Sequence, residues 1–79
     1  MLPQLLVNVR VKERRPLDQL TGVQHEIRAC EADLNGSGRV LVRFSGTEPL
    51  LRVMVEGAEQ RQIERLAERI VCAIHTELG

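Results

Sequence analysis

Aromatic residues are almost absent from this sequence, which contains no tryptophan, no tyrosine and a single phenylalanine, Phe44. Proteins that bind single-stranded nucleic acid stack the bases on exposed aromatic rings, and this chain lacks such a surface. The 11 basic and 11 acidic side chains also cancel, so no net charge attracts a polyanion. We therefore expect no nucleic-acid partner, and any site for an anion must be local.

Long apolar runs are missing as well. No stretch approaches the roughly 20 apolar residues that a membrane-spanning helix needs. The N-terminus also lacks the basic and then apolar segments of a secretion signal. These absences predict a soluble protein of the cytoplasm with no membrane partner.

Residues that form disulfides or bind metals are few. Cys30 and Cys72 lie in two separate segments with helical patterning, as do His25 and His75, and their spacing is not that of a metal site. We predict that both thiols behave as small buried apolar groups without a disulfide, and that both histidines lie at the surface. We also expect this chain itself to hold no metal and no cofactor.

The length and the apolar content set the size of the fold. With 79 residues, 43% of them hydrophobic, the chain is expected to form a single domain, residues 1–79. A domain of this size buries roughly 60% of the surface of its unfolded chain. That leaves room for one sheet and two helices.

Alternating apolar residues predict three strands. The first lies at residues 5–12, and two more flank a short polar loop within residues 38–57. The apolar face of these strands consists of Leu5, Val7, Val9, Val11, Val40, Val42, Phe44, Val53 and Val55.

Two further segments repeat apolar residues at the spacing of an α-helix. Thr21 and Gln24 have the spacing of a capping box, which predicts that the first helix begins at Thr21, and Asn35-Gly36 is typical of a helix end. The second and stronger helix follows Gly57. The apolar stripes consist of Leu20, Val23, Ile27, Cys30 and Leu34 in the first helix and of Ile63, Leu66, Ala67, Ile70, Val71, Ile74 and Leu78 in the second.

The predicted order is β-α-β-β-α, an α+β fold with both helices packed on one face of an antiparallel-rich sheet. The other face would then carry Leu6, Arg10, Leu41, Arg43, Arg52 and Met54. Three apolar side chains exposed together beside arginines are typical of a surface that meets another domain or chain. This assignment depends on the strand register, because a slip of one residue exchanges the two faces.

The loop between the second and third strands has the composition of an anion site. Arg43 enters it, Arg52 leaves it, and Ser45, Gly46 and Thr47 lie between them. A phosphate accepts hydrogen bonds from several directions, and guanidinium groups, hydroxyls and backbone amides supply the donors. We expect Gly46 to let those amides converge on one point. The alternative is a polar hairpin loop in which Ser45 and Thr47 bond only to their own backbone.

The residues 43–56, RFSGTEPLLRVMVE, and 3–12, PQLLVNVRVK, resemble the C-terminal domain of the phosphohexomutase family. Within that family, Gly46 is similar to the bacterial aminosugar branch, the phosphoglucosamine mutases. The likeness extends into the last helix and covers essentially the whole chain. It implies the TBP-like fold of that C-terminal domain.

The resemblance also implies a function. The chain would be the last domain of a four-domain isomerase that interconverts glucosamine 6-phosphate and glucosamine 1-phosphate on the route to cell-wall precursors. The family's phosphoserine, its magnesium ion and its sugar-recognition loop belong to the three preceding domains, so this chain alone is expected to be inactive. By the match of motif positions, Arg43, Ser45, Gly46, Thr47 and Arg52 would bind the substrate phosphate that is not transferred.

The resemblance assigns Glu48 and Pro49 to the shape of the loop. Because a phosphate repels the Glu48 carboxylate, we expect it to turn away, to pair with an arginine, or to meet a cationic or hydroxyl group of the ligand. A function of another class stays open, namely a stand-alone α+β module that binds a protein partner through its apolar and basic face. Phosphate titration separates the two, since only the first predicts binding at residues 45–47.

Overall fold

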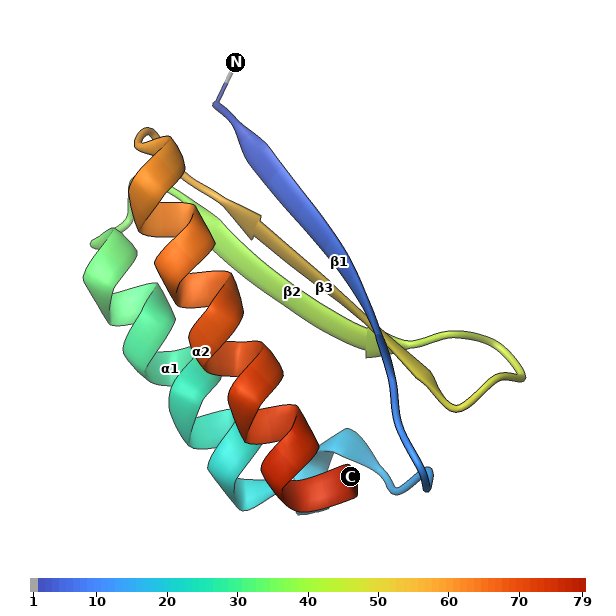
Figure 1. Ribbon diagram of the computed structural model, residues 1–79. Coiled ribbons are helices and arrows are strands. Elements are labelled where there is room, and N and C mark those ends of the chain that lie inside the picture. Colours follow the sequence, from blue (N-terminus) through green and yellow to red (C-terminus); the bar gives the residue numbers. More distant parts are fainter. Residues whose placement is uncertain (1) are drawn as a thin grey trace.

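The computed structural model describes residues 2–79 as one sheet covered on one side by two helices (Figure 1). The strands β1 (Gln4–Arg10), β2 (Arg39–Phe44) and β3 (Leu50–Glu56) are antiparallel in the order β1-β3-β2. The helices are α1 (Thr21–Leu34) and α2 (Gln60–Leu78), and the short 3₁₀ helix η1 (Leu17–Gln19) precedes α1. The predicted α+β fold, with the order β-α-β-β-α and both helices on one face, is confirmed.

The central strand β3 is hydrogen-bonded to both of its neighbours. Gln4 pairs with Glu56 and Arg10 pairs with Leu50, so β1 runs from one end of the sheet to the other along β3. The strand β1 therefore begins at the end of the sheet opposite to the loop between β2 and β3 (Figure 1).

The register confirms the predicted division between the two faces of the sheet. Leu6, Met54 and Leu41 form one row across the face that the helices leave uncovered. Leu6 is 71% exposed and Leu41 is 43% exposed. Met54 is only 8% exposed, because it lies on the central strand between the other two. The predicted apolar patch is present, but only its two flanking members face solvent.

Helix α1 begins at Thr21, as predicted, but the predicted capping box is wrong. Thr21 is already the first helical residue, so Leu20 occupies the capping position, and no side chain of α1 caps the start. The carboxylate of Glu77, near the end of α2, accepts the N–H of Val23 at 2.7 Å instead. Asn35 ends the helix in the left-handed conformation with φ of 50°, as predicted.

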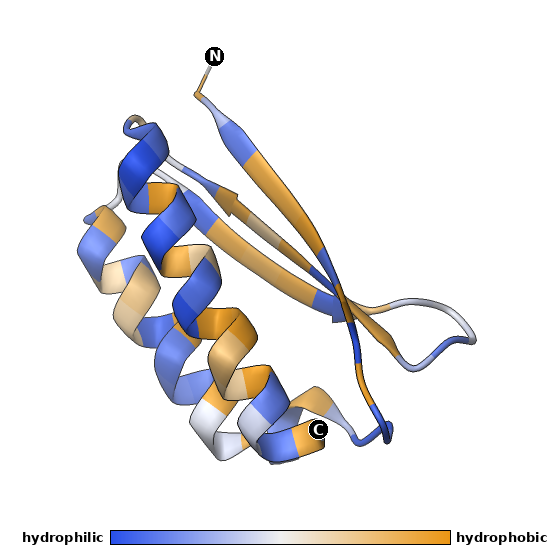
Figure 2. Ribbon diagram, viewed as in Figure 1, coloured by the Kyte–Doolittle hydropathy of each residue, from blue (hydrophilic) through white to orange (hydrophobic). Residues whose placement is uncertain are grey.

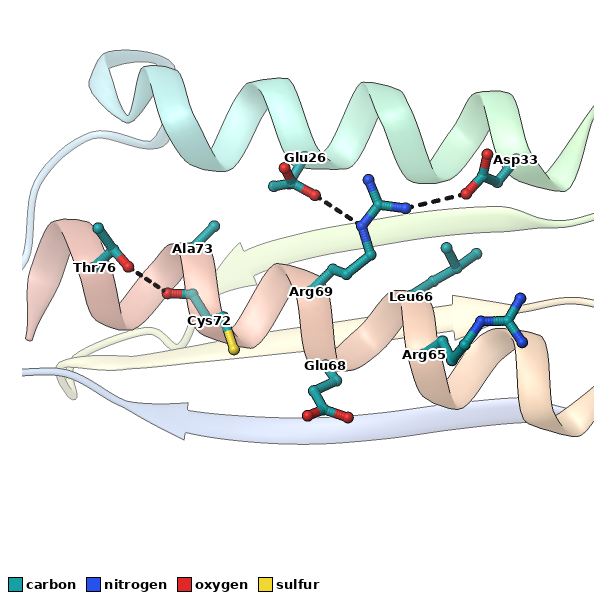
Figure 3. Close-up of a pocket in the computed structure, with 9 residues that line it drawn as sticks. All are labelled: Glu26, Asp33, Arg65, Leu66, Glu68, Arg69, Cys72, Ala73 and Thr76. Carbon is teal, nitrogen blue, oxygen red and sulfur yellow. Dashed lines mark hydrogen bonds and ion pairs between the residues drawn. The ribbon is translucent and has the colours of Figure 1, made fainter.

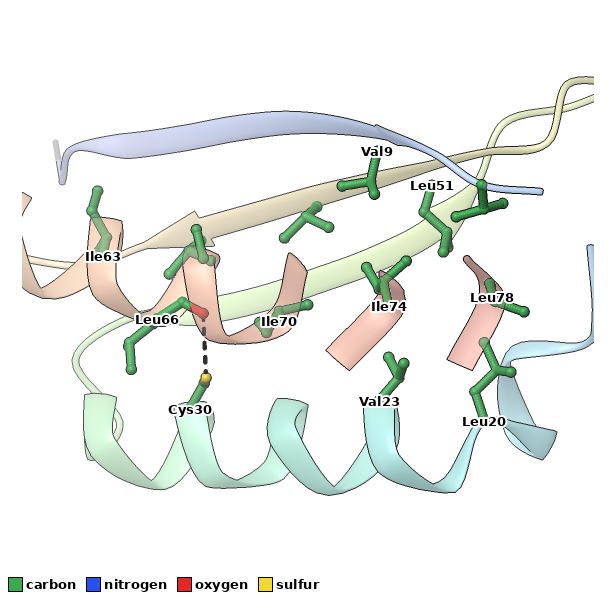
Figure 4. Close-up of a cluster of buried hydrophobic side chains, with 14 of the residues drawn as sticks. Val9, Leu20, Val23, Cys30, Leu51, Ile63, Leu66, Ile70, Ile74 and Leu78 are labelled. Carbon is green, nitrogen blue, oxygen red and sulfur yellow. Dashed lines mark hydrogen bonds between the residues drawn. The ribbon is translucent and has the colours of Figure 1, made fainter. Parts of the chain in front are cut away.

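The apolar sides of the sheet and the helices meet in one core (Figure 4). Figure 2 shows apolar residues along all three strands, whereas the loop after β2 is mostly near neutral in hydropathy and partly hydrophilic. Of the stripe predicted for α2, only Val71 is half-buried. Its fully enclosed members are Ile63, Leu66, Ala67, Ile70, Ile74 and Leu78.

The two cysteines have different surroundings. Cys30 is buried in the core with its Sγ 3.6 Å from the carbonyl oxygen of Leu66 (Figure 4), and this burial raises the pKa of the thiol. Cys72 is exposed, so the prediction of two buried thiols is wrong for it. Residue 72 lies two positions from both Ile70 and Ile74, which places it on the opposite side of a helix with 3.6 residues per turn.

His25 and His75 are exposed, as predicted. Among residues 2–79, no helix combines the length and the apolar character required to cross a membrane.

Candidate functional site

Residues 45–49 form the loop that joins β2 to β3 and projects beyond the end of the sheet, away from both helices (Figure 1). The N–H of Ser45 donates to the carbonyl of Leu50 at 2.8 Å and closes the loop at its base. The N–H of Val11, directly after β1, donates to the carbonyl of Pro49 at 2.9 Å. The loop is thus anchored both by its own hairpin and by the first strand.

Two of the predicted site residues lie opposite each other at the base of this loop. Arg43 on β2 and Arg52 on β3 are cross-strand partners, and both are exposed on the uncovered face. Within residues 2–79, neither guanidinium forms an ion pair. Like charges directly opposite on neighbouring strands repel each other. An anion placed beside both of them would remove that repulsion.

Arg14 holds one side of the loop, a role that the sequence analysis missed. Its Nη1 donates to the carbonyl oxygens of Ser45 at 2.8 Å and Glu48 at 3.1 Å, and it lies 3.4 Å from that of Gly46. Its Cζ lies 4.7 Å from the centre of the Phe44 ring. The only signal in the sequence is that the basic row of the first strand continues to Arg14, since no spacing connects this residue with a loop that follows 31 positions later.

The direction of these carbonyls determines the direction of the amides. In a trans peptide, the C=O and the next N–H point to opposite sides. Since the carbonyls of Ser45 and Gly46 face Arg14, the N–H groups of Gly46 and Thr47 point away from it. In the part of the chain that the structure covers, neither amide donates a hydrogen bond.

Gly46 lies where the backbone of the loop borders open space. Among residues 2–79, the glycines with positive φ are Gly36 and Gly79, so Gly46 does not need the left-handed conformation. The convergence expected of the loop amides therefore does not rely on a left-handed residue at this position. A Cβ added at Gly46 would meet no atom within 4 Å, so its Cα borders open space in which a ligand could approach the backbone.

The hydroxyls of the loop are also available. Over residues 2–79, neither Ser45 Oγ nor Thr47 Oγ1 bonds to the backbone, whereas the hydroxyls of Ser37 and Thr76 do. The structure therefore does not have the alternative arrangement, in which the hydroxyls of Ser45 and Thr47 bond to the backbone of their own loop. Both groups remain free to donate to a ligand.

Glu48 pairs with Arg10, one of the three arrangements expected for it. The distance from Arg10 Nη2 to Glu48 Oε2 is 3.3 Å, and both side chains are more than half exposed. Such an exposed pair contributes little to stability. The ion pair with Arg10 of β1 partly neutralises the negative charge of the Glu48 carboxylate beside the site.

A groove of about 560 Å³ is lined by residues of α1 and α2 (Figure 3). The paired arginines lie on the face of the sheet that the helices leave uncovered. Arg69 bridges Glu26 and Asp33 across the groove at 3.1 Å each. No predicted site residue lines the groove. Its lining consists of Glu26, Asp33, Arg65, Leu66, Glu68, Arg69, Cys72, Ala73 and Thr76.

Carboxylate, thiol and imidazole groups are dispersed over the molecule. Among the residues that the structure describes, no three of them lie close enough to hold a metal ion.

Comparison with known proteins identifies the family to which this sequence is similar. The sequence profile of a family described as "Phosphoglucomutase/phosphomannomutase, C-terminal domain" matches residues 6–73. A phosphoglucosamine mutase of Bdellovibrio bacteriovorus is 52% identical over 78 residues, which is 99% of this chain and 17% of that protein. One of Solibacter usitatus is 54% identical over 77 residues, which is 98% of this chain and 17% of that protein. The chain thus spans about a sixth of the length of these relatives.

Solved structures show the same fold. An N-acetylphosphoglucosamine mutase of Aspergillus fumigatus in complex with GlcNAc-6P and magnesium superposes with a TM-score of 0.79 at 31% identity, over 99% of this chain and 16% of that one. A serine-to-alanine variant in complex with glucose 1,6-bisphosphate gives a TM-score of 0.82 at 32% identity, over 99% of this chain and 16% of that chain.

Proposed function

This chain belongs to the phosphoglucomutase/phosphomannomutase family as its C-terminal domain, and from this premise we propose that it binds the phosphate group of an aminosugar phosphate within a phosphoglucosamine mutase. The complete enzyme would interconvert glucosamine 6-phosphate and glucosamine 1-phosphate. In this proposal the phosphate that is not transferred lies at the loop after β2. Its ligands are the side chains or amides of Arg43, Ser45, Gly46, Thr47 and Arg52.

The observation that carries the proposal is the pair Arg43 and Arg52. Two exposed guanidinium groups opposite each other, with no acidic partner within residues 2–79, form a site with two positive charges. A phosphate near neutral pH carries one to two negative charges and accepts bidentate hydrogen bonds from the planar fork of arginine. The repulsion in the free domain thereby becomes attraction for the ligand.

The loop supplies the remaining donors. The amides of Gly46 and Thr47 point away from Arg14 and the hydroxyls of Ser45 and Thr47 are free, so donors are available to phosphate oxygens that the arginines do not reach. Ser45 is thus a phosphate ligand and not a nucleophile. The pairing of Glu48 with Arg10 reduces the repulsion between its carboxylate and the ligand.

The described residues do not fit a magnesium site, because no three potential ligands come together. We assign magnesium, together with the phosphoserine and the sugar-recognition loop, to the three preceding domains of the complete enzyme. The partners of this chain are then those domains and the sugar phosphate. The isolated chain would have no mutase activity.

Binding by the isolated domain is expected to be weak. A hydrogen bond with a charged partner contributes about 1.5–3 kcal/mol, and ordering the loop and the ligand consumes much of the sum of several such bonds. A remainder of about 4 kcal/mol corresponds to a millimolar Kd. Such an affinity suits a domain that closes over one end of a substrate which other domains hold as well.

A second function is supported by the exposed side chains of Leu6 and Leu41. As a stand-alone module, the domain would bind a protein partner through this apolar patch, and the loop would be only a turn.

Titration of the ¹⁵N-labelled chain with glucosamine 6-phosphate separates the two functions. We expect the amides of Ser45, Gly46 and Thr47 to shift first, with a millimolar Kd, and inorganic phosphate to shift the same amides. Glucosamine at equal concentration is the control, because it has no phosphate. Shifts spread over the helices would contradict phosphate binding and favour the module. So would the absence of any shift at a ligand concentration 50-fold above a Kd of about 1 mM.

A further inference from the structure

We propose that Arg14 is a positioning residue, which holds the carbonyls of Ser45, Gly46 and Glu48 on one side of the loop and so directs the amides of Gly46 and Thr47 toward the phosphate. This inference rests on the proposed function and adds to it a residue from outside the loop and its flanking strands. Arg14 itself does not touch the ligand in this proposal.

Four contacts restrain the guanidinium of Arg14, three with carbonyl oxygens and one with an aromatic ring. Its Nη1 is bonded to two loop carbonyls at 2.8 and 3.1 Å and lies 3.4 Å from a third. The planar group also lies over Phe44, the single aromatic residue of the chain, at 4.7 Å. An arginine over an aromatic ring is held by a cation–π interaction, so the ring restricts where this guanidinium can lie.

Arg14 acts on the amides through the geometry of the peptide group. A planar trans peptide that points its C=O at Arg14 must point its N–H to the opposite side. The peptides between Ser45 and Gly46 and between Gly46 and Thr47 both do so. Arg14 thereby determines the side of the loop to which the N–H groups of Gly46 and Thr47 point, and neither N–H donates a hydrogen bond within residues 2–79.

The arginines near the loop differ in what they contact. Arg43 and Arg52 have no ion partner within the described residues and are free to contact the anion. Arg14 is committed to carbonyls, and bonds from a charged donor are stronger than neutral ones. A lysine in its place would keep the charge but lose the planar group that lies over Phe44.

Inorganic phosphate is the probe for this role, titrated into the ¹⁵N-labelled 79-residue chain. Arg14→Gln is compared with the wild type and with Arg28→Gln, a control on the exposed side of α1. We expect the Gly46 and Thr47 amide signals of free Arg14→Gln to move, its helix signals to stay, and its Kd for phosphate to rise about tenfold. Arg14→Lys should be intermediate, and Arg28→Gln should match the wild type.

Several results would overturn the inference. Unchanged phosphate affinity in Arg14→Gln would show that the loop needs no such support. A lost affinity with unmoved Gly46 and Thr47 amides would make Arg14 a direct ligand instead. If Arg14→Gln does not fold, Phe44→Leu tests the same contact, and an affinity equal to that of the wild type refutes the role. A wild-type chain that does not bind phosphate refutes the proposed function itself.

Discussion

Replacing Arg43 by glutamine is expected to weaken phosphate binding and, at the same time, to stabilise the free domain. Arg43 lies directly opposite Arg52, and a like-charge cross-strand pair costs about 0.2–1 kcal/mol. Removing about 0.5 kcal/mol of repulsion should raise the Tm of a domain of this size by roughly 2–4 °C. The variant also loses a charged donor to phosphate, which raises the Kd by about 10- to 100-fold.

Phosphate should reverse the order of the two melting temperatures. With a Kd of about 1 mM, 10 mM phosphate stabilises the wild type by about 1.4 kcal/mol, or roughly 6–11 °C, and stabilises Arg43→Gln by a small fraction of that. The assay is thermal denaturation followed by circular dichroism, with sodium chloride matched in ionic strength as the reference. Arg28→Gln is the control, because it should respond to phosphate as the wild type does.

Two outcomes would refute this reasoning. If Arg43→Gln melts below the wild type without phosphate, the paired arginines do not repel each other in the free domain. If phosphate stabilises both proteins equally, Arg43 is not part of the site. The stabilisation of the free variant should also diminish in high salt, since salt screens exposed charges.

Further predictions concern the core, the helix contact and the thiols. Ile70→Ala should lower the free energy of unfolding by about 2–5 kcal/mol in urea denaturation, because the side chain is fully buried, and a smaller loss would contradict the packing. Glu77→Gln should lower it by about 1 kcal/mol, because a neutral amide is a weaker acceptor for the Val23 N–H, and an unchanged Tm would argue against this cap. Mass spectrometry after iodoacetamide treatment at pH 8 should find Cys72 modified and Cys30 unmodified in the folded protein, because burial raises the pKa of Cys30 and excludes the reagent. Both should react in denaturant.

The fold could be predicted because its signals are local. Alternation along each strand identified the core face, and the register then brought Leu6 and Leu41 to the uncovered face on either side of Met54. The start of α1 was placed correctly for the wrong reason, since its cap is Glu77, which lies 54 residues beyond Val23. Neither propensity nor spacing reveals such a contact.

The candidate site was predictable in part. The composition of the loop and its two flanking arginines indicated an anion, and strand pairing is what places Arg43 beside Arg52. The orientation of the loop peptides could not be read from the residues, because it depends on Arg14 and on the carbonyls that Arg14 contacts. The loop turns without a left-handed residue at Gly46, and the sequence does not reveal which backbone conformation that glycine adopts.

The loop lies at the opposite end of the sheet from the start of β1, so a rotation around that start displaces the loop by a distance that grows with the length of the strand. Seven residues of β1 at about 3.3 Å each separate the two ends by roughly 23 Å. A rotation of about 10° around the start of β1 would therefore carry the loop through roughly 4 Å, about one strand-to-strand spacing. In the proposed enzyme, a small rotation at one edge of the domain would therefore be enough to bring the loop donors to a sugar phosphate or to withdraw them, with no change inside the domain.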